Sequence, residues 1–68
     1  MSIEIVVNGE PRTVPEGLTV AGLLARLELD PARVAVELDR SIVRKTHWDS
    51  TPVAGGARLE IVQFVGGG

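Results

Sequence analysis

Three consecutive glycines, Gly66, Gly67 and Gly68, close the chain and carry the arrangement of groups best suited to chemistry. Because glycine has no Cβ, such a segment can lie flat in a narrow tunnel and adopt backbone angles closed to other residues. Three extended residues reach about 10 Å, far enough to carry a terminal carboxylate into the active site of another protein. Once a nucleotide-dependent enzyme activates it as an acyl-adenylate, a carboxylate can accept sulfide or an amine. We therefore expect the chemistry of the chain to reside on the carboxylate of Gly68.

The other side chains form no recognisable catalytic or metal-binding motif. Cysteine is absent, which excludes disulfides and thiolate chemistry. His47 and Asp49 flank Trp48, but with no evident Ser or Cys nucleophile we expect Trp48 to anchor a loop and His47 to be exposed. A single histidine is also too few for tetrahedral zinc, which needs three or four ligands. Gly55 and Gly56 lack the following Lys-Ser/Thr of a phosphate-binding loop, so any ATP belongs to a partner.

Composition narrows the class of protein further. The 68 residues carry a formal charge of −2, which argues against nucleic acid because phosphate binding needs a clustered positive surface. Arg40, Arg44 and Lys45 form one basic cluster, typical of a solvated turn, although it can alternatively steer an acidic partner. The hydrophobic share of 44% favours one packed domain. With no N-terminal signal pattern and no apolar run of roughly 20 residues, we expect a cytoplasmic protein without a membrane partner, monomeric when free.

The beginning of the chain has the pattern of a β-hairpin. Apolar residues alternate over positions 3–7 with the period of a half-buried strand. Asn8 and Gly9 follow directly, a strong hairpin signal because both tolerate positive φ. Residues 12–14 can form the return strand, and the Pro-Glu-Gly sequence at 15–17 is expected to end it.

A short amphipathic helix is predicted next. Thr19 is the expected N-cap, because its hydroxyl can accept from an amide of the first turn. Gly22 lowers the intrinsic helix propensity by roughly 1 kcal/mol relative to Ala, so packing must hold the helix. Asp30 and Pro31 are expected to end it or to start a separate turn. Four apolar residues then share one helical face: Val20, Leu23, Leu24 and Leu27.

Three further strands are predicted, at residues 34–38, 42–43 and 58–65, with a turn at 39–41 and no clear period over 44–56. The order is strand, strand, helix, strand, strand, strand. One helix then serves as the crossover and covers one face of the sheet. The expected fold is α+β, a ubiquitin-like β-grasp with a mixed sheet of four to five strands. Its first and last strands are expected to lie parallel at the centre.

The last strand separates two faces. Leu59 and Ile61 alternate with Arg58 and Glu60, so the first pair is expected to face the core and the second the solvent. Near the glycines the solvent-facing side becomes apolar, and an exposed apolar patch beside a reactive tail is a natural docking surface. The alternatives are average protein surface, or a phenylalanine that folds over the edge of the core. The expected docking residues are Val6, Val62, Phe64 and Val65.

Several segments together resemble the sulfur carrier proteins of thiamine biosynthesis, and the similarity covers the whole length. The segments are residues 7–10 (VNGE), 15–21 (PEGLTVA), 34–38 (VAVEL), Trp48 and residues 59–68 (LEIVQFVGGG). The closing stretch is the specific one. The chain departs from the family pattern in three places: the turn at 55–57 has no Gly-Asp pair, Asp39 and Arg40 replace Asn-Gly, and Arg44 replaces a frequent proline. The first two departures lie in turns away from the tail and affect local turn geometry rather than the chemistry, and the third leaves its stretch less rigid.

The resemblance implies a β-grasp domain over residues 1–65, and a flexible tail, residues 66–68, that threads the active site of a partner. It also implies a reaction cycle. A ThiF-like adenylating enzyme uses ATP and magnesium to form an acyl-adenylate on Gly68. Sulfur supplied indirectly by a cysteine desulfurase replaces AMP, and thiazole synthase receives the sulfur from the resulting thiocarboxylate. The chain would be a protein cosubstrate with no catalytic residue, bound cofactor or metal of its own.

Other functions share these features. The small subunit of molybdopterin synthase has the same fold and chemistry, and carriers for cysteine synthesis or tRNA thiolation are further possibilities. A ubiquitin-like modifier would join Gly68 to lysines of target proteins, and a plain interaction module would not use its tail. Lys45 is the only lysine, so the chain has little capacity to build polymers on itself. The absence of cysteine leaves no internal thiol to capture the activated carboxyl group, which also fits a carrier.

Overall fold

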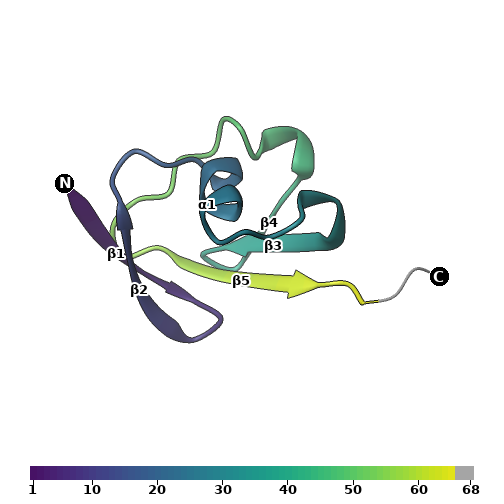
Figure 1. Ribbon diagram of the computed structural model, residues 1–68, viewed down its shortest axis with the longest axis horizontal. Helices are drawn as coiled ribbons and strands as arrows, with labels where there is room; N and C mark the ends of the chain where they lie inside the picture. The colour runs from purple at the N-terminus through teal and green to yellow at the C-terminus, as the bar shows by residue number, and fades with distance from the viewer. Residues whose placement is uncertain (66–68) are drawn as a thin grey trace.

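The computed structural model describes residues 1–65, so the predicted glycine tail lies outside the described residues. A five-stranded mixed sheet is covered on one face by helix α1 (Val20–Arg26), as Figure 1 shows. The strands are β1 (Ser2–Val7), β2 (Glu10–Pro15), β3 (Val34–Leu38), β4 (Ser41–Val43) and β5 (Arg58–Gln63). Two short 3₁₀ helices, η1 (Pro31–Arg33) and η2 (Lys45–His47), lie in the connections.

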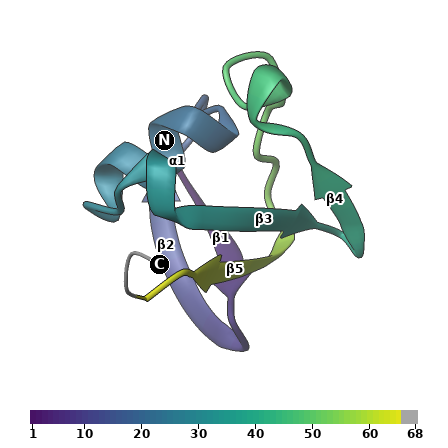
Figure 2. The same cartoon turned by 90° about the vertical axis from the view of Figure 1, so that its right-hand side faces the viewer.

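The sheet has the order β2-β1-β5-β3-β4, which places the last strand at its centre. β5 is parallel to β1, with Val6 opposite Arg58, and antiparallel to β3, with Val36 opposite Ile61. β5 therefore lies between β1 and β3 in the ladder, and Figure 2 shows it running beside β3. The predicted β-grasp fold, with its first and last strands parallel at the centre, is therefore confirmed.

The opening hairpin forms at the predicted turn. Asn8 has φ 52° and Gly9 has φ 81°, the positive values that match the twist of a two-residue hairpin. The return strand is longer than predicted, because pairing continues up to Pro15, which lies opposite Ser2. Proline is tolerated there because β2 is an edge strand and its nitrogen can face away from the ladder.

Helix α1 is short and capped as predicted. The Thr19 hydroxyl accepts from the Gly22 N–H at 3.2 Å. The helix ends at Arg26, and Glu28 then adopts φ 59°, which turns the chain out of the helix. Asp30 caps the separate turn η1, with its carboxylate accepting from the Ala32 N–H at 2.9 Å.

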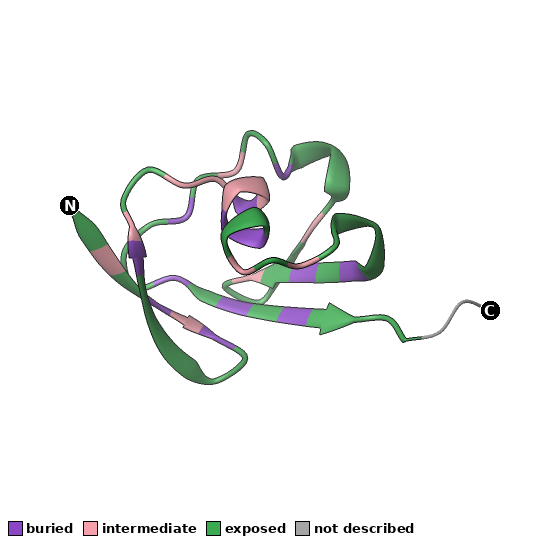
Figure 3. Ribbon diagram, viewed as in Figure 1, coloured by how far each residue is buried: buried purple, intermediate pink, exposed green. Residues whose placement is uncertain are grey.

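The core lies between the sheet and α1. Figure 3 shows buried and exposed residues alternating along β3 and β5, which leaves the opposite face of the sheet uncovered. No helix among residues 1–65 is long and apolar enough to cross a membrane. The buried hydrophobic residues are Ile5, Val7, Val14, Val20, Leu23, Leu24, Val34, Val36, Trp48, Val53, Ala57, Leu59 and Ile61.

The last strand is shorter than the predicted range of 58–65, because β5 ends at Gln63. Its neighbours explain the early end. On one side β1 stops at Val7, and on the other β3 begins only at Val34. One further backbone bond, from the Phe64 N–H to the Arg33 carbonyl at 2.7 Å, extends the contact beyond the strand.

Candidate functional site

The end of β5 is the part of the molecule from which the candidate reactive group extends. Val65 is the last described residue and is 94% exposed. Gly66, Gly67 and Gly68, the predicted tail and modification site, lie outside the described residues. The structure therefore defines the base of the tail and not the Gly68 carboxylate.

An asparagine side chain fixes this base on one side. The Ile61 N–H donates to Asn8 Oδ1 at 2.7 Å, and Asn8 Nδ2 donates to the Ile61 carbonyl at 3.1 Å. The Asn8 side chain thus replaces a backbone residue as the partner of β5, just where β1 turns away. Sequence reasoning identified Asn8 only as a turn residue. The run Val7-Asn8-Gly9, with an amide at the turn position beside a central strand, is the signal that could have revealed the second role.

Three of the four predicted docking residues lie close together in sequence at the end of β5. Val62 is 56% exposed and Phe64 is 55% exposed, and Val65 follows directly. Phe64 therefore does not fold over the core, which was one of the alternatives. We call Val62, Phe64 and Val65 the tail-proximal patch.

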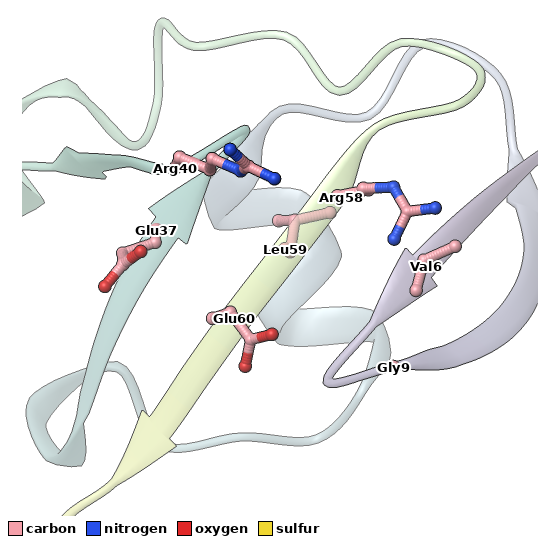
Figure 4. Close-up of a pocket in the computed structure, with 7 residues that line it drawn as sticks. All are labelled: Val6, Gly9, Glu37, Arg40, Arg58, Leu59 and Glu60. Carbon is pink, nitrogen blue, oxygen red and sulfur yellow. The ribbon is translucent and has the colours of Figure 1, made fainter.

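The fourth docking residue, Val6, lies apart from the tail-proximal patch. It pairs with Arg58, four residues before Val62 along β5, a separation of roughly 13 Å at the strand rise. Val6 instead lines a shallow hollow of about 520 Å³ on the uncovered face (Figure 4). The two apolar surfaces are separated along the strand by the charged residues Arg58 and Glu60.

Charged side chains dominate this hollow. Glu37 and Glu60 lie directly opposite each other on β3 and β5, and Arg40 and Arg58 line its other end (Figure 4). Within residues 1–65 the only salt bridge joins Arg33 Nε to Asp30 Oδ2 at 3.6 Å, so these four side chains form none. The uncovered face is consequently apolar beside the tail and charged farther from it.

The loop around Trp48 has a structural role. Trp48 is buried, and its Nε1–H donates to the Val43 carbonyl at 2.9 Å. His47 is exposed on η2, and its carbonyl accepts from Thr51 Oγ1 at 2.7 Å. This confirms the expected loop anchor. Among the described residues, no group of three or more His, Asp or Glu is placed to hold a metal ion.

The fold and the sequence together define a class of small β-grasp proteins in which the central last strand is followed by terminal glycines. Comparison with known proteins places the chain in this class. Residues 5–68 match the ThiS family, and the chain belongs to that family. The resemblance found in the sequence is thereby confirmed.

Solved structures agree with this assignment. The crystal structure of the thiamine biosynthesis protein ThiS from Geobacter metallireducens is 36% identical and superposes with a TM-score of 0.85. The superposition covers 97% of this chain and all of that one. A solution structure of a thiamine biosynthesis protein from the same organism gives a TM-score of 0.79 over 88% of its own chain.

Curated relatives fall into two groups. A thiazole synthase from Paramagnetospirillum magneticum is 42% identical over 66 residues, which are 97% of this chain but only 20% of that protein. The chain therefore spans about a fifth of the length of this relative and of a second thiazole synthase, from Magnetococcus marinus, which is 35% identical. The ycf40 protein of Porphyra purpurea, described as uncharacterized, is 33% identical over 94% of its length.

Proposed function

We propose that the chain is the sulfur carrier of thiamine biosynthesis and that it carries sulfur as a thiocarboxylate on Gly68. The observation that supports this most directly is the family match, which extends through the glycines to residue 68. Whole-chain superposition on a solved thiamine biosynthesis protein supports the same function. The exposed end of a central strand also suits the delivery of a tail to another protein.

The proposed reaction has two steps, both catalysed by partners. In the first, the Gly68 carboxylate attacks the α-phosphate of ATP, and pyrophosphate leaves. In the second, a sulfide-equivalent sulfur attacks the acyl carbon, and AMP leaves with its electron pair. ATP and magnesium belong to a ThiF-like adenylating enzyme in this proposal. The sulfur comes ultimately from a cysteine desulfurase as a persulfide, and a thiol reduces that persulfide to the sulfide level while being oxidised to a disulfide. The carrier supplies only the acyl group and the surface that presents it.

Thiazole synthase is the proposed acceptor of the sulfur. Two relatives named thiazole synthase contain a segment similar to this chain within a longer protein. Joining a carrier to the enzyme that consumes its sulfur raises the effective concentration of one for the other. This arrangement supports the thiamine pathway over the alternatives of molybdopterin synthesis, cysteine synthesis and tRNA thiolation.

The uncovered face of the sheet is the proposed docking surface. In this proposal the tail-proximal patch contacts the rim of the partner's active site, and Val6 contacts the partner farther from the tail. Apolar side chains that are more than half exposed at Val62 and Phe64 would lose their contact with water on docking, which stabilises a complex.

Mass spectrometry of the C-terminal peptide tests the function. The chain is incubated with a ThiF-like adenylating enzyme, ATP, magnesium and a sulfur donor. We expect an ATP-dependent replacement of one oxygen by sulfur on Gly68. Fragmentation must localise the change, because this replacement is nearly isobaric with oxidation of Met1 or Trp48.

Two controls make the test decisive. Omission of ATP must abolish the mass change, and a known carrier must be modified by the same enzyme preparation. An unmodified Gly68 in the presence of that active enzyme would contradict the carrier function. Attachment of Gly68 to a lysine of another protein would support the modifier alternative instead.

A further inference from the structure

The edge of β5 that faces β1 is open just before the tail. Ile61 directs its N–H and carbonyl toward Asn8, whereas Phe64 directs its N–H toward Arg33 on the opposite side. Backbone groups alternate sides along a strand. The N–H and carbonyl of Gln63 therefore point to the same side as those of Ile61, away from β3.

No strand of the described chain pairs with Gln63 on that side. β1 ends at Val7, and the hairpin turn at Asn8 and Gly9 leads the chain away from β5. Asn8 is thus the last partner of β5 along this edge. An exposed strand edge with unpaired N–H and C=O groups is a template for an additional strand.

A groove runs beside this open edge. It encloses about 360 Å³, and its lining includes Asn8, Gln63, Arg12 and Arg26. The only salt bridge within residues 1–65 lies elsewhere, so neither arginine forms one. A single acidic side chain, that of Glu28, shares the lining. The groove therefore favours an extended segment with an acidic side chain.

We infer that an extended segment of the adenylating enzyme pairs with the open edge of β5 at Gln63 and places an acidic side chain against Arg12 and Arg26. This inference rests on the proposed function, because it names the enzyme that receives the tail as the occupant. Main-chain pairing of this kind supplies affinity without demanding a particular side chain on the carrier. Pairing at Gln63 also holds the backbone only three residues before Gly66, and so aligns the tail with the partner's active site.

The variant Gln63→Pro tests whether the backbone N–H of Gln63 pairs with the adenylating enzyme. Proline removes the N–H that faces the open edge, and it is tolerated in strands where no ladder bond is lost. We expect the KM of the adenylating enzyme for the carrier to rise about tenfold, as expected for one lost intermolecular hydrogen bond, with kcat unchanged. Gln63→Ala is the matched control, because it alters the side chain and keeps the N–H; its KM should equal that of the wild type.

A second variant covers the case in which Gln63→Pro fails to fold. A synthetic chain with an ester in place of the peptide bond between Val62 and Gln63 lacks the same N–H without the constraint of a proline ring. Both chains are checked by thermal unfolding, and either one with wild-type stability is sufficient. The double variant Arg12→Gln/Arg26→Gln tests the acidic side chain, and it should raise KM and weaken its dependence on salt.

The outcomes separate the inference from the function. Adenylation of a folded Gln63→Pro or ester chain with wild-type KM overturns the inference and leaves the carrier function intact. Failure of an active enzyme to adenylate the wild-type chain overturns both. Concentration-dependent dimerisation that Gln63→Pro abolishes would assign the edge to a second copy of this chain, which also overturns the inference.

Discussion

At the scale of single residues, Asn8 contributes most to the candidate site, because both its backbone and its side chain position the end of β5. Its backbone forms the hairpin turn at φ 52°, while its side chain makes two hydrogen bonds to Ile61, 53 residues away in the sequence. One residue therefore connects the opening hairpin to the strand that leads to the tail. Trp48 has a comparable structural role, since its indole N–H donates a hydrogen bond to the carbonyl of Val43 on β4.

Asn8→Gly is expected to destabilise the protein. Glycine tolerates the positive φ of the turn, so the change isolates the loss of the side chain. Ile61 would lose both partners in a partly buried position, which we expect to lower the free energy of unfolding by about 1–3 kcal/mol. Chemical denaturation gives this value, and faster hydrogen exchange of the Ile61 amide should accompany it. Asn8→Asp keeps an acceptor for that amide and should retain part of the protection; equal protection in all three proteins would contradict the assigned role.

At the scale of elements, the turn between β3 and β4 is strained in a way that its sequence explains. Asp39 has φ 48° and Arg40 has φ 71°, where the family pattern has Asn-Gly. Asp39 offsets part of the cost, because its carboxylate accepts from the Arg58 N–H at 3.0 Å. Arg40 has no such compensation among the hydrogen bonds of the described residues.

Arg40→Gly should therefore stabilise the protein. A left-handed conformation costs a residue with a Cβ roughly 1–2 kcal/mol, and the greater entropy of glycine in the unfolded chain recovers part of that. We expect a net gain of about 0.5–1 kcal/mol in the free energy of unfolding. Arg40→Ala is the control, because it removes the charge and keeps the Cβ. A gain of the same size in Arg40→Ala would mean that charge, rather than backbone strain, determines the effect.

The secondary-structure elements could be predicted where residues close together in the sequence determine where an element begins or ends. The alternation over residues 3–7, the turn at Asn8 and the Thr19 cap all appear in the structure because each is determined within a few residues. The end of β5 was not predictable in this way. Apolar residues continue to Val65, but the ladder stops at Gln63 because its neighbours stop, which is a property of the sheet.

The candidate site was predictable in part, for the same reason. Period-two alternation placed Val62 and Phe64 on the uncovered face. It also placed Val6 on that face but gave no register. In the observed register Val6 lies opposite Arg58, four residues before Val62. The hydrogen bonds between the Asn8 side chain and Ile61 depend on the parallel pairing of β1 with β5, so only the three-dimensional arrangement reveals them.

At the scale of the whole molecule, one helix covers one face of the sheet and the other face is open. On that face Val62 and Phe64 lie at the end of β5, and the charged hollow lies toward the start of the strand. A partner that fits both surfaces is restricted to one orientation. A partner whose charges complement those of the hollow would gain in specificity and in the rate of association.

The double variant Val62→Ser/Phe64→Ser tests the docking surface. Both side chains are more than half exposed, so the free energy of unfolding should change by less than about 1 kcal/mol. Affinity for the adenylating enzyme, measured by titration calorimetry, should fall at least about tenfold because apolar contacts at the centre of an interface carry much of its energy. Ala25→Ser is the control: Ala25 is exposed on α1, which covers the other face of the sheet. Equal losses in both variants would contradict a docking role specific to the patch.

The central position of β5 also determines when the protein can fold during its synthesis. Residues 1–57 contain β1 to β4 but lack the strand that joins β1 to β3. Without it the two hairpins have no common ladder, and Leu59 and Ile61 are missing from the core. Contacts between the first and last strands must close the longest loop in the chain, which is a slow step in folding. We therefore expect a chain truncated before β5 to stay unfolded, and to be open to proteolysis until β5 has been synthesised.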